Sequence, residues 1–321
     1  MFQQAHTVAM FTVKEMRIGQ SILQYRREEV TGFQCRISPG RTMRGIDVPF
    51  GFSSDPDGCP FCPGQVESTT PAFPDGKRIR VGESITFPNL FPFARYHIVT
   101  SITSSHQVEG FSKEQLLDAF EAQYLKLMTF GGYPSINWNY LPSAGASLAH
   151  PHLQGMADDQ PSSLLERYLS GSRHYLDRNG RNYWEDWQEH ESGTERFLSD
   201  DEIHWYAHAV PLGEREVRGI LPVSTLDDST PYLEPLVEGI LRMIRLYRDL
   251  GTHAFNMSLF FDRQGSNNGF KGFCSMISRI NPNGLSLGDS SFMERLHLEP
   301  VILTLPEELG NYYTRGGAGK G

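Results

Sequence analysis

The sequence predicts an α+β protein of two related halves, in which antiparallel sheets are flanked by helices. Three observations predict this class. Apolar residues recur at helical spacing in two segments, 112–131 and 230–251. Strand-like runs lie before and after each segment, and the same order of strands and helix occurs twice along the chain. With 321 residues the chain can bury a large core, in one big domain or in two similar ones.

Each half is expected to begin with two strands and to continue with one helix. The strands lie at 84–87 and 96–100 in the first half, and at 204–210 and 217–222 in the second. In the first half Ser112-Lys-Glu-Gln115 matches a capping box, which predicts a helix start, and Gly131-Gly132 ends the helix. In the second half Thr230-Pro231 starts the helix and Gly251 ends it.

The segments that follow the two helices differ between the halves. Strands are expected at 135–140 in the first half, and at 254–261 and 273–280 in the second. The first half then carries His150-Pro-His-Leu-Gln154, at the place where the second half carries Ser275-Met-Ile-Ser-Arg279. We therefore expect the second copy to be a degenerate version of the first.

The two halves are predicted to be separate units joined by a helical linker. The first unit spans 1–157, the linker 158–202 and the second unit 203–321. The linker is polar and aromatic, and we expect a helix over 164–189 with a break near Asn179-Gly180.

Composition and charge restrict the class of partner. A formal net charge of −9 argues against a general nucleic-acid binder, which should be basic. The N-terminus lacks a basic-then-apolar signal pattern, and no apolar run approaches the ~18 residues of a membrane span. Four cysteines are too few for a disulfide scaffold in a chain of this length. We therefore expect a cytoplasmic protein that binds neither nucleic acid nor membranes.

The segment His150-Pro-His-Leu-Gln154 indicates phosphoryl-type chemistry. Pro151 lacks a backbone N–H and tells against a helix, and in an extended strand His150, His152 and Gln154 point to the same side. The preceding loop is small and polar, as in a loop that passes close to a bound group. The segment thus offers a nucleophile, a neighbour that orients it and neutral donors for phosphate oxygens.

Cys59-Pro-Phe-Cys62 is a good half-site for zinc, because two thiolates at a tight turn can converge on one tetrahedral ion. Histidines must supply the other two ligands, and His106 and His150 are the best placed. His97 competes with His106, but it lies inside an apolar strand, where a packed core imidazole is the commoner role. The alternative interpretation is a redox-active or incidental cysteine pair.

Together these segments resemble the galactose-1-phosphate uridylyltransferase family, a branch of the histidine-triad superfamily. The resemblance covers roughly 32–166 and continues weakly through the second half. Besides the cysteine pair and the histidine segment, it rests on Ser38-Pro-Gly-Arg41-Thr-Met-Arg44, Thr86-Phe-Pro-Asn89-Leu-Phe91, Asn139, and Gly145-Ala-Ser147. Leu90 departs from the pattern, since the family has Asp at that position.

The resemblance implies a fold, a metal and a set of site residues. The fold would be a duplicated histidine-triad-like unit with one structural zinc ion per chain, held by Cys59, Cys62, His106 and His150. His152 would be the nucleophile. Gln154 would donate a hydrogen bond to phosphate without supplying a proton, which favours transfer over hydrolysis. The residues that would bind substrate are Arg41, Arg44, Phe87, Asn89, Asn139, Gly145 and Ser147.

The activity that the resemblance implies is nucleotidyl transfer by a ping-pong route through a covalent nucleotidyl-histidine. The preferred substrates are a UDP-sugar as donor of UMP and a sugar 1-phosphate as the phosphorylated acceptor, as in hexose-1-phosphate uridylyltransferases. One alternative is a phosphorylase that transfers AMP from ADP-glucose or Ap4A. A second is a zinc-stabilised nucleotide-binding protein without catalysis. Family members are often dimers, so a homodimer is expected.

Overall fold

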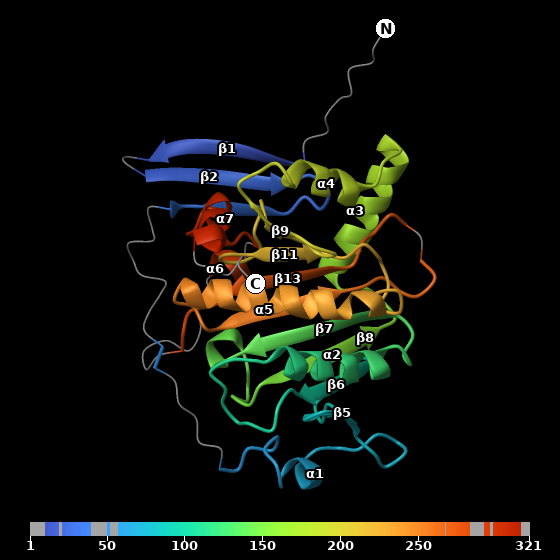
Figure 1. Cartoon of the computed structure of the whole chain (residues 1–321). Coiled ribbons are helices and arrows are strands. Elements are labelled where there is room, and N and C mark those ends of the chain that lie inside the picture. The colour runs from blue at the N-terminus through green and yellow to red at the C-terminus, as the bar shows by residue number, and fades with distance from the viewer. Residues whose placement is uncertain are drawn as a thin grey trace.

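Two antiparallel-rich sheets form the framework of the protein (Figure 1). The computed structural model describes residues 10–18, 21–39, 50–51, 57–266, 268–282, 292–295 and 298–315. Within these residues the larger sheet has ten strands, in the order β4 (Ile79–Val81), β5 (Ser84–Pro88), β6 (Tyr96–Ser101), β8 (His152–Asp158), β7 (Tyr133–Tyr140), β12 (Phe255–Phe260), β13 (Phe273–Ser278), β11 (Val217–Ile220), β10 (His204–Ala207) and β9 (Phe197–Asp200). Every pairing in this sheet is antiparallel.

The strand order of the large sheet repeats from its centre outward. One half runs β7, β8, β6, β5, β4 and the other runs β12, β13, β11, β10, β9. Helix α2 (Lys113–Leu127) connects β6 to β7, and α5 (Leu233–Asp249) connects β11 to β12 in the same way. The halves join where β7 pairs with β12, with Tyr140 opposite Phe255. The α+β class with flanking helices is confirmed, and the repeated order agrees with a duplicated unit.

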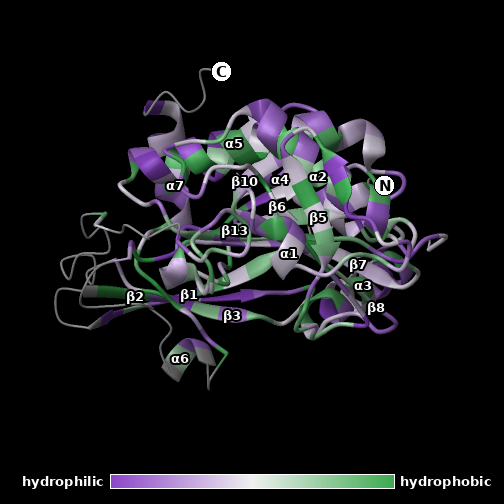
Figure 2. Cartoon of the chain, turned by 90° about the horizontal axis from the view of Figure 1, so that it is seen from below, coloured by the Kyte–Doolittle hydropathy of each residue, from purple (hydrophilic) through white to green (hydrophobic). Residues whose placement is uncertain are grey.

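Helices α2 and α5 lie side by side on one face of the large sheet (Figure 2). The capping box that starts α2 is confirmed: the Ser112 hydroxyl accepts from the Gln115 N–H, and the Gln115 side chain accepts from the Ser112 N–H. Apolar residues of both helices form one buried cluster with the strands below them. One close contact is at Gly155 of β8, where a Cβ atom would lie 1.9 Å from Gln123 Oε1 of α2.

Some predicted boundaries differ from the structure. The segment at Thr230–Tyr232 is a 3-10 turn, and the α-helix begins only at Leu233. The strand expected over 204–210 ends at Ala207, shortly before Pro211, which has no N–H to donate to a sheet ladder. The linker contains two helices, α3 (Ser163–Asn179) and α4 (Tyr183–Glu191). Gly180 ends α3 with a left-handed φ of 65°, which confirms the predicted break.

The smaller sheet was not predicted from the sequence. It contains β1 (Phe11–Ile18), β2 (Ser21–Glu28), β3 (Gln34–Ile37) and β14 (Val301–Ile302), and it joins residues from both ends of the chain. The guanidinium of Arg26 holds the Glu307 carboxylate by two bonds of 2.9 Å, which ties this sheet to α7 (Pro306–Arg315). Short helices α1 (Val66–Thr69), η2 (Pro142–Ala144) and α6 (Phe292–Arg295) complete the described elements.

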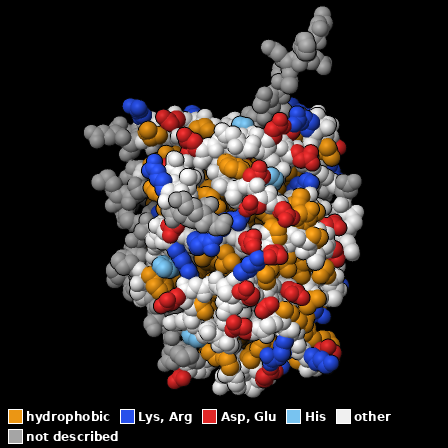
Figure 3. Space-filling model, viewed as in Figure 1, with side chains coloured by type: hydrophobic (Ala, Val, Ile, Leu, Met, Phe, Trp, Pro, Cys, Tyr) orange, Lys and Arg blue, Asp and Glu red, His pale blue; other side chains and the backbone are white. Residues whose placement is uncertain are grey.

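The surface carries charges of both signs. On the face seen in Figure 3, Lys and Arg side chains are interspersed with Asp and Glu side chains. That pattern differs from the single basic stripe typical of nucleic-acid binders. None of the helices in the described part of the chain combines the length and apolar character needed to cross a membrane.

Candidate active site and metal centre

Side chains from separate segments meet on the face of the large sheet opposite α2. Residues directly across from each other in antiparallel strands share a face. Gln154 of β8 pairs with Val99 of β6, and Val99 pairs with Phe87 of β5. On the other side Gln154 pairs with Asn137 of β7. Because side chains alternate along a strand, His152 and His97 lie on this same face.

A cavity of about 340 Å³ opens on this face. Five of the predicted site residues line it: Phe87, Asn89, Ser147, His152 and Gln154. The remaining walls come from residues of the segment 60–71 and from Leu90, Phe91, Val99 and Leu148. The sheet register therefore brings the predicted nucleophile, its carboxamide neighbour and part of the predicted nucleoside stretch into one site.

His152 is held in one orientation by its own strand. Its Nδ1 lies 2.8 Å from the carbonyl oxygen of His150, to which the ring N–H donates. This bond leaves Nε2 as the unprotonated nitrogen, with a lone pair for attack. Burial lowers the pKa of His152 below its ordinary value, against the opposing effect of the bond to His150. The neutral ring is the form that a histidine nucleophile requires.

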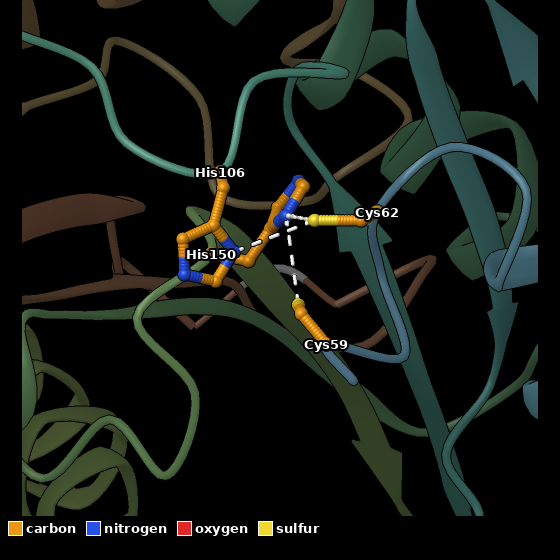
Figure 4. Close-up of side chains that lie close together, drawn as sticks. All are labelled: Cys59, Cys62, His106 and His150. Carbon is orange, nitrogen blue, oxygen red and sulfur yellow. Dashed lines mark hydrogen bonds between the residues drawn. The ribbon is translucent and has the colours of Figure 1, made fainter. Parts of the chain in front are cut away.

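The four predicted metal ligands lie together (Figure 4). The Sγ atoms of Cys59 and Cys62 and one ring nitrogen each of His106 and His150 are all within 4.8 Å of one another. Cys59 Sγ lies 3.8 Å from His150 Nδ1, and Cys62 Sγ lies 3.6 Å from the same nitrogen. Cys62 Sγ lies 3.4 Å from His106 Nδ1. A tetrahedral zinc ion with bonds of ~2.3 Å to S and ~2.0 Å to N separates a sulfur from a nitrogen ligand by about 3.5 Å.

The surroundings of this cluster also suit a cation. His150 Nε2 lies 2.8 Å from the carbonyl oxygen of Thr103 and donates to it, which leaves Nδ1 free to bind a metal. Burial, together with the neighbouring Cys59, raises the pKa of the Cys62 thiol to about 11. Two adjacent thiolates therefore need a cation between them. The cluster can hold a metal ion through four protein ligands, which leaves no open position for catalysis.

Asn139 and Gly145 lie beside the cavity but are not among the residues that line it. Asn139 Oδ1 accepts a bond of 2.8 Å from Asn256, whose amide also donates to the Ala144 carbonyl at 2.7 Å. Gly145 has a φ of +89°, where a side chain is strained, and a Cβ atom there would meet the Asn139 amide at 3.8 Å. These contacts fix the loop that carries Ser147. Arg41 and Arg44 lie outside the described residues.

Two contacts near His152, the candidate nucleophile, were missed by the sequence interpretation. The ring of Phe61, between the two cysteines, lies edge-on to His152 with 5.3 Å between centroids. His97 is buried, as expected for a core imidazole, but its Nε2 lies 3.0 Å from Gln154 Oε1. The position of Phe61 inside the cysteine motif was the one available signal. Nothing in the local sequence links His97 to Gln154.

In the second half a buried ionic network occupies the place equivalent to the candidate active site. Strand β13 has the position that β8 has in the first half, and its Ser275 hydroxyl donates to Glu216 at 2.7 Å. Glu216 is paired with Arg218 at 2.7 Å, and both are buried. Tyr168 of α3 and Glu28 of β2 pack over this pair. The linker and the small sheet thus cover this face of the second half.

Comparisons with known proteins extend over most of the chain. No model of a known protein family matches the sequence. An uncharacterised protein of Archaeoglobus fulgidus is 29% identical over 304 residues, which are 91% of this chain and 92% of that protein.

Two solved structures are similar in fold at low sequence identity. An ADP-glucose phosphorylase from Arabidopsis thaliana, solved with bound ADP-glucose, has a TM-score of 0.72 at 17% identity and covers 91% of this chain and 99% of its own. A uridylyltransferase has a TM-score of 0.67 at 17% identity and covers 92% of this chain and 98% of its own. The chain therefore has the fold of these uridylyltransferase and ADP-glucose phosphorylase structures, as the sequence resemblance predicted.

Proposed function

We propose that the protein is a nucleotidyltransferase that works through a covalent nucleotidyl-His152 intermediate. The observation that carries the proposal is the orientation of His152, whose Nδ1–H donates to the His150 carbonyl while its ring lines the cavity. A buried, neutral imidazole with a fixed N–H is a competent nucleophile toward phosphorus. The shared fold supports the proposal without defining the substrate.

The reaction would proceed in two displacements. In the first, the lone pair of His152 Nε2 attacks the α-phosphorus of a nucleoside diphosphate sugar. A P–N bond forms, and the bond from the α-phosphorus to the bridging oxygen breaks, so that sugar 1-phosphate leaves. In the second, a phosphate oxygen of the acceptor attacks the same phosphorus, and the P–N bond breaks. The bond from Nδ1–H to the carbonyl supports the positive charge that the ring carries between the two steps.

Neutral donors around the cavity would stabilise the phosphoryl oxygens. Gln154 and Ser147 line the cavity beside His152, and each can donate a hydrogen bond without giving up a proton. That property favours transfer of the nucleotidyl group over its hydrolysis. Arg41 and Arg44 remain candidates for the phosphate charge, because Arg binds phosphate through two parallel bonds.

The preferred donor is a UDP-sugar and the preferred acceptor is a sugar 1-phosphate. One observation favours a second candidate, in which AMP is transferred from ADP-glucose. Leu90 lines the cavity and is 60% exposed, at the position where the uridylyltransferase pattern has Asp. An apolar side chain there removes a hydrogen-bonding group from the nucleoside end of the site. Phe87, Asn89 and Phe91 would surround the nucleoside in either case.

A zinc ion would have a structural role in this protein. Cys59, Cys62, His106 and His150 would hold it, and four protein ligands leave no place for substrate on the metal. His150 would then bind the metal through its side chain and orient His152 through its carbonyl.

The test is transfer of label from a donor to the protein. Purified protein would be incubated separately with UDP-glucose, ADP-glucose and Ap4A, each radiolabelled at the α-phosphorus. We expect an acid-labile label on the protein from one nucleotide class, its loss in His152→Ala, and its release by the matching acceptor. His190→Ala changes an exposed histidine of α4 and serves as the control. If no donor labels the protein, both enzyme hypotheses are wrong and the non-catalytic binding protein remains.

A further inference from the structure

The orientation of the Gln154 carboxamide is set by a histidine outside the cavity lining. We propose that His97 is a positioning residue that holds the Gln154 oxygen and so turns its NH₂ group toward the phosphoryl oxygens. The role rests on the proposed nucleotidyl transfer. The positioning role adds to that proposed function, because it assigns to His97 a task that the local sequence does not indicate.

The sheet register places His97 next to Gln154. His97 pairs with Met156 across β6 and β8, so Gln154 is its diagonal neighbour on the same face. The two side chains are in contact, with 3.0 Å between His97 Nε2 and Gln154 Oε1. His97 is 5% exposed, so its ring is held in the sheet and water competes little for this bond.

The neighbours of His97 determine which ring nitrogen carries the proton. The Phe93 N–H points at Nδ1 from 3.4 Å. The Asn89 carboxamide has its oxygen occupied by the Phe91 N–H at 2.9 Å, so its NH₂ group faces the His97 ring, with the nitrogen 3.4 Å from Nδ1 and 3.1 Å from Nε2. The Asn89 group contacts both ring nitrogens and does not distinguish them, but the Phe93 N–H can only donate, so Nδ1 is the acceptor of that bond. The proton is then on Nε2, and Nε2–H donates to Gln154 Oε1.

The charge of the ring is consistent with this tautomer. Burial lowers the pKa of His97, opposed by the Gln154 bond and by Asp158, so the ring is neutral and has a single N–H. A protonated ring would direct a second N–H, on Nδ1, at the N–H of Phe93. The neutral tautomer with its proton on Nε2 satisfies both Phe93, which donates to Nδ1, and Gln154, which accepts from Nε2.

The bond from His97 determines which end of the Gln154 carboxamide faces the cavity. With Oε1 bound to His97, the Gln154 NH₂ group is the end left for a ligand in the cavity. The opposite flip would direct a partially negative oxygen at an anionic phosphoryl group, which is repulsive. The same contacts link Gln154 through His97 to Asn89, so the segment expected to surround the nucleoside also supports the group expected to touch phosphate.

The kinetic test compares two substitutions of His97, one that removes the hydrogen-bond donor and one that keeps an N–H. His97→Phe keeps a buried ring without an N–H, while His97→Gln offers an amide N–H near the position of Nε2. With the donor that labels wild type, we expect His97→Phe to slow labelling at saturating donor by roughly 10- to 100-fold, less than the 10²–10³-fold typical of a lost oxyanion donor. We expect His97→Gln to recover most of the rate, with the half-saturating donor concentration nearly unchanged in both.

A double-mutant cycle separates positioning from structural support. In a Gln154→Ala background the carboxamide is gone, so His97→Phe should slow labelling no further. An equal additional loss in that background would show that His97 acts on the fold and would overturn the proposal. Thermal unfolding and zinc content of each variant would identify any protein that has failed to fold, and His97→Gln then carries the comparison.

A third measurement does not depend on catalysis. In protein with ¹⁵N-labelled histidine, NMR of the ring nitrogens would identify the His97 tautomer, assigned by its absence from His97→Gln. We expect a proton on Nε2, whether or not any donor labels the protein. A proton on Nδ1 would overturn the positioning role. Absence of label from wild type together with an Nε2 proton would contradict the nucleotidyltransferase and leave the orientation of Gln154 standing.

Discussion

The ring of Phe61 packs edge-on against the imidazole of His152, with 5.3 Å between centroids and 73° between ring planes. Phe61 lies between Cys59 and Cys62 in the sequence, so the loop with two of the candidate metal ligands also forms a wall beside the proposed nucleophile. Phe61 also contacts Phe87 at 5.3 Å. The metal cluster and the cavity are therefore parts of one structural unit.

Phe61→Ala should slow nucleotidyl labelling by roughly 10- to 100-fold, because a reacting group displaced by about 1 Å can lose ~10²-fold in rate. The metal ligands are unchanged, so zinc content should stay at the wild-type level. Labelling rate and metal analysis of the same preparation would check both points. Tyr312→Ala, which removes an exposed aromatic side chain from α7, is the matched control. A wild-type labelling rate in Phe61→Ala would contradict the role of this wall.

Cys59→Ser should lower zinc content well below the one ion per chain expected of wild type. Serine is a poor ligand for zinc, and three remaining ligands hold the ion more weakly. The midpoint of thermal unfolding should fall by several degrees, since metal binding stabilises the folded state. Metal analysis and calorimetry would measure the two effects. Cys35→Ala, in β3 and outside the cluster, should retain zinc. Full zinc occupancy in Cys59→Ser would refute the site.

The buried carboxylate of Glu28 should make the protein less stable as the pH becomes acidic. Burial alone would raise the pKa of Glu28, but the bond and charge of His208 and the charge of Arg218 outweigh it and lower the pKa from 4.5 to about 2. A carboxyl with a lowered folded-state pKa stabilises the protein above its unfolded pKa, and this stability is lost as the pH falls from about 4.5 toward 2. Each pKa unit corresponds to 1.36 kcal/mol, so Glu28 contributes about 3 kcal/mol to the free energy of unfolding at neutral pH.

The measurement is the free energy of unfolding between pH 7 and pH 3. Glu28→Gln should be less stable than wild type by about 3 kcal/mol at neutral pH, and the difference should shrink as the pH falls. Glu29→Gln, a change of the neighbouring exposed carboxylate, should have little effect. A Glu28→Gln protein with the same acid dependence as wild type would show that other groups cause that dependence.

Gly155→Ala should destabilise the protein by about 1–3 kcal/mol through overpacking. A Cβ atom there would lie 1.9 Å from Gln123 Oε1 and 2.9 Å from Ile98 Cγ1. Gln123 is fully buried and bonded to Thr100 at 2.7 Å, so it cannot move away without losing that bond. Denaturant unfolding would measure the effect. Gly193→Ala meets nothing within 4 Å and should be neutral or slightly stabilising, and equal effects of the two changes would contradict the close packing of α2 on β8.

Much of the first half could be predicted because its signals are local. The capping box at Ser112 and Gln115 specifies a helix start within one turn of chain. The spacing of Cys59 and Cys62 indicates a shared ligand within a single turn, and the alternation at His152 and Gln154 follows from the pleat of one strand. Each of these patterns depends on neighbouring residues alone. Cys59, Cys62, His106 and His150 form the expected cluster, although it joins segments that are far apart in the sequence.

The small sheet and the contacts of His97 could not be predicted in this way. Strand β14 joins β3 across more than 260 residues, as the pairing of Val301 with Arg36 shows. The bond from His97 to Gln154 requires the register of β6 on β8, which are separated along the chain by α2 and β7. A register shift by one residue would turn each of these side chains to the opposite face.

The sequence by itself determined the class of fold, the two helices with their preceding strands, and the identity of the candidate metal ligands and of the proposed nucleophile. Only the tertiary structure decided how these residues face one another. It put Phe61 against His152, directed one end of Gln154 toward His97, and filled the equivalent place in the second half with Glu216 and Arg218. The physical reason is that secondary structure follows from periodicity within a segment. Contacts between segments instead depend on strand register and packing over the whole chain.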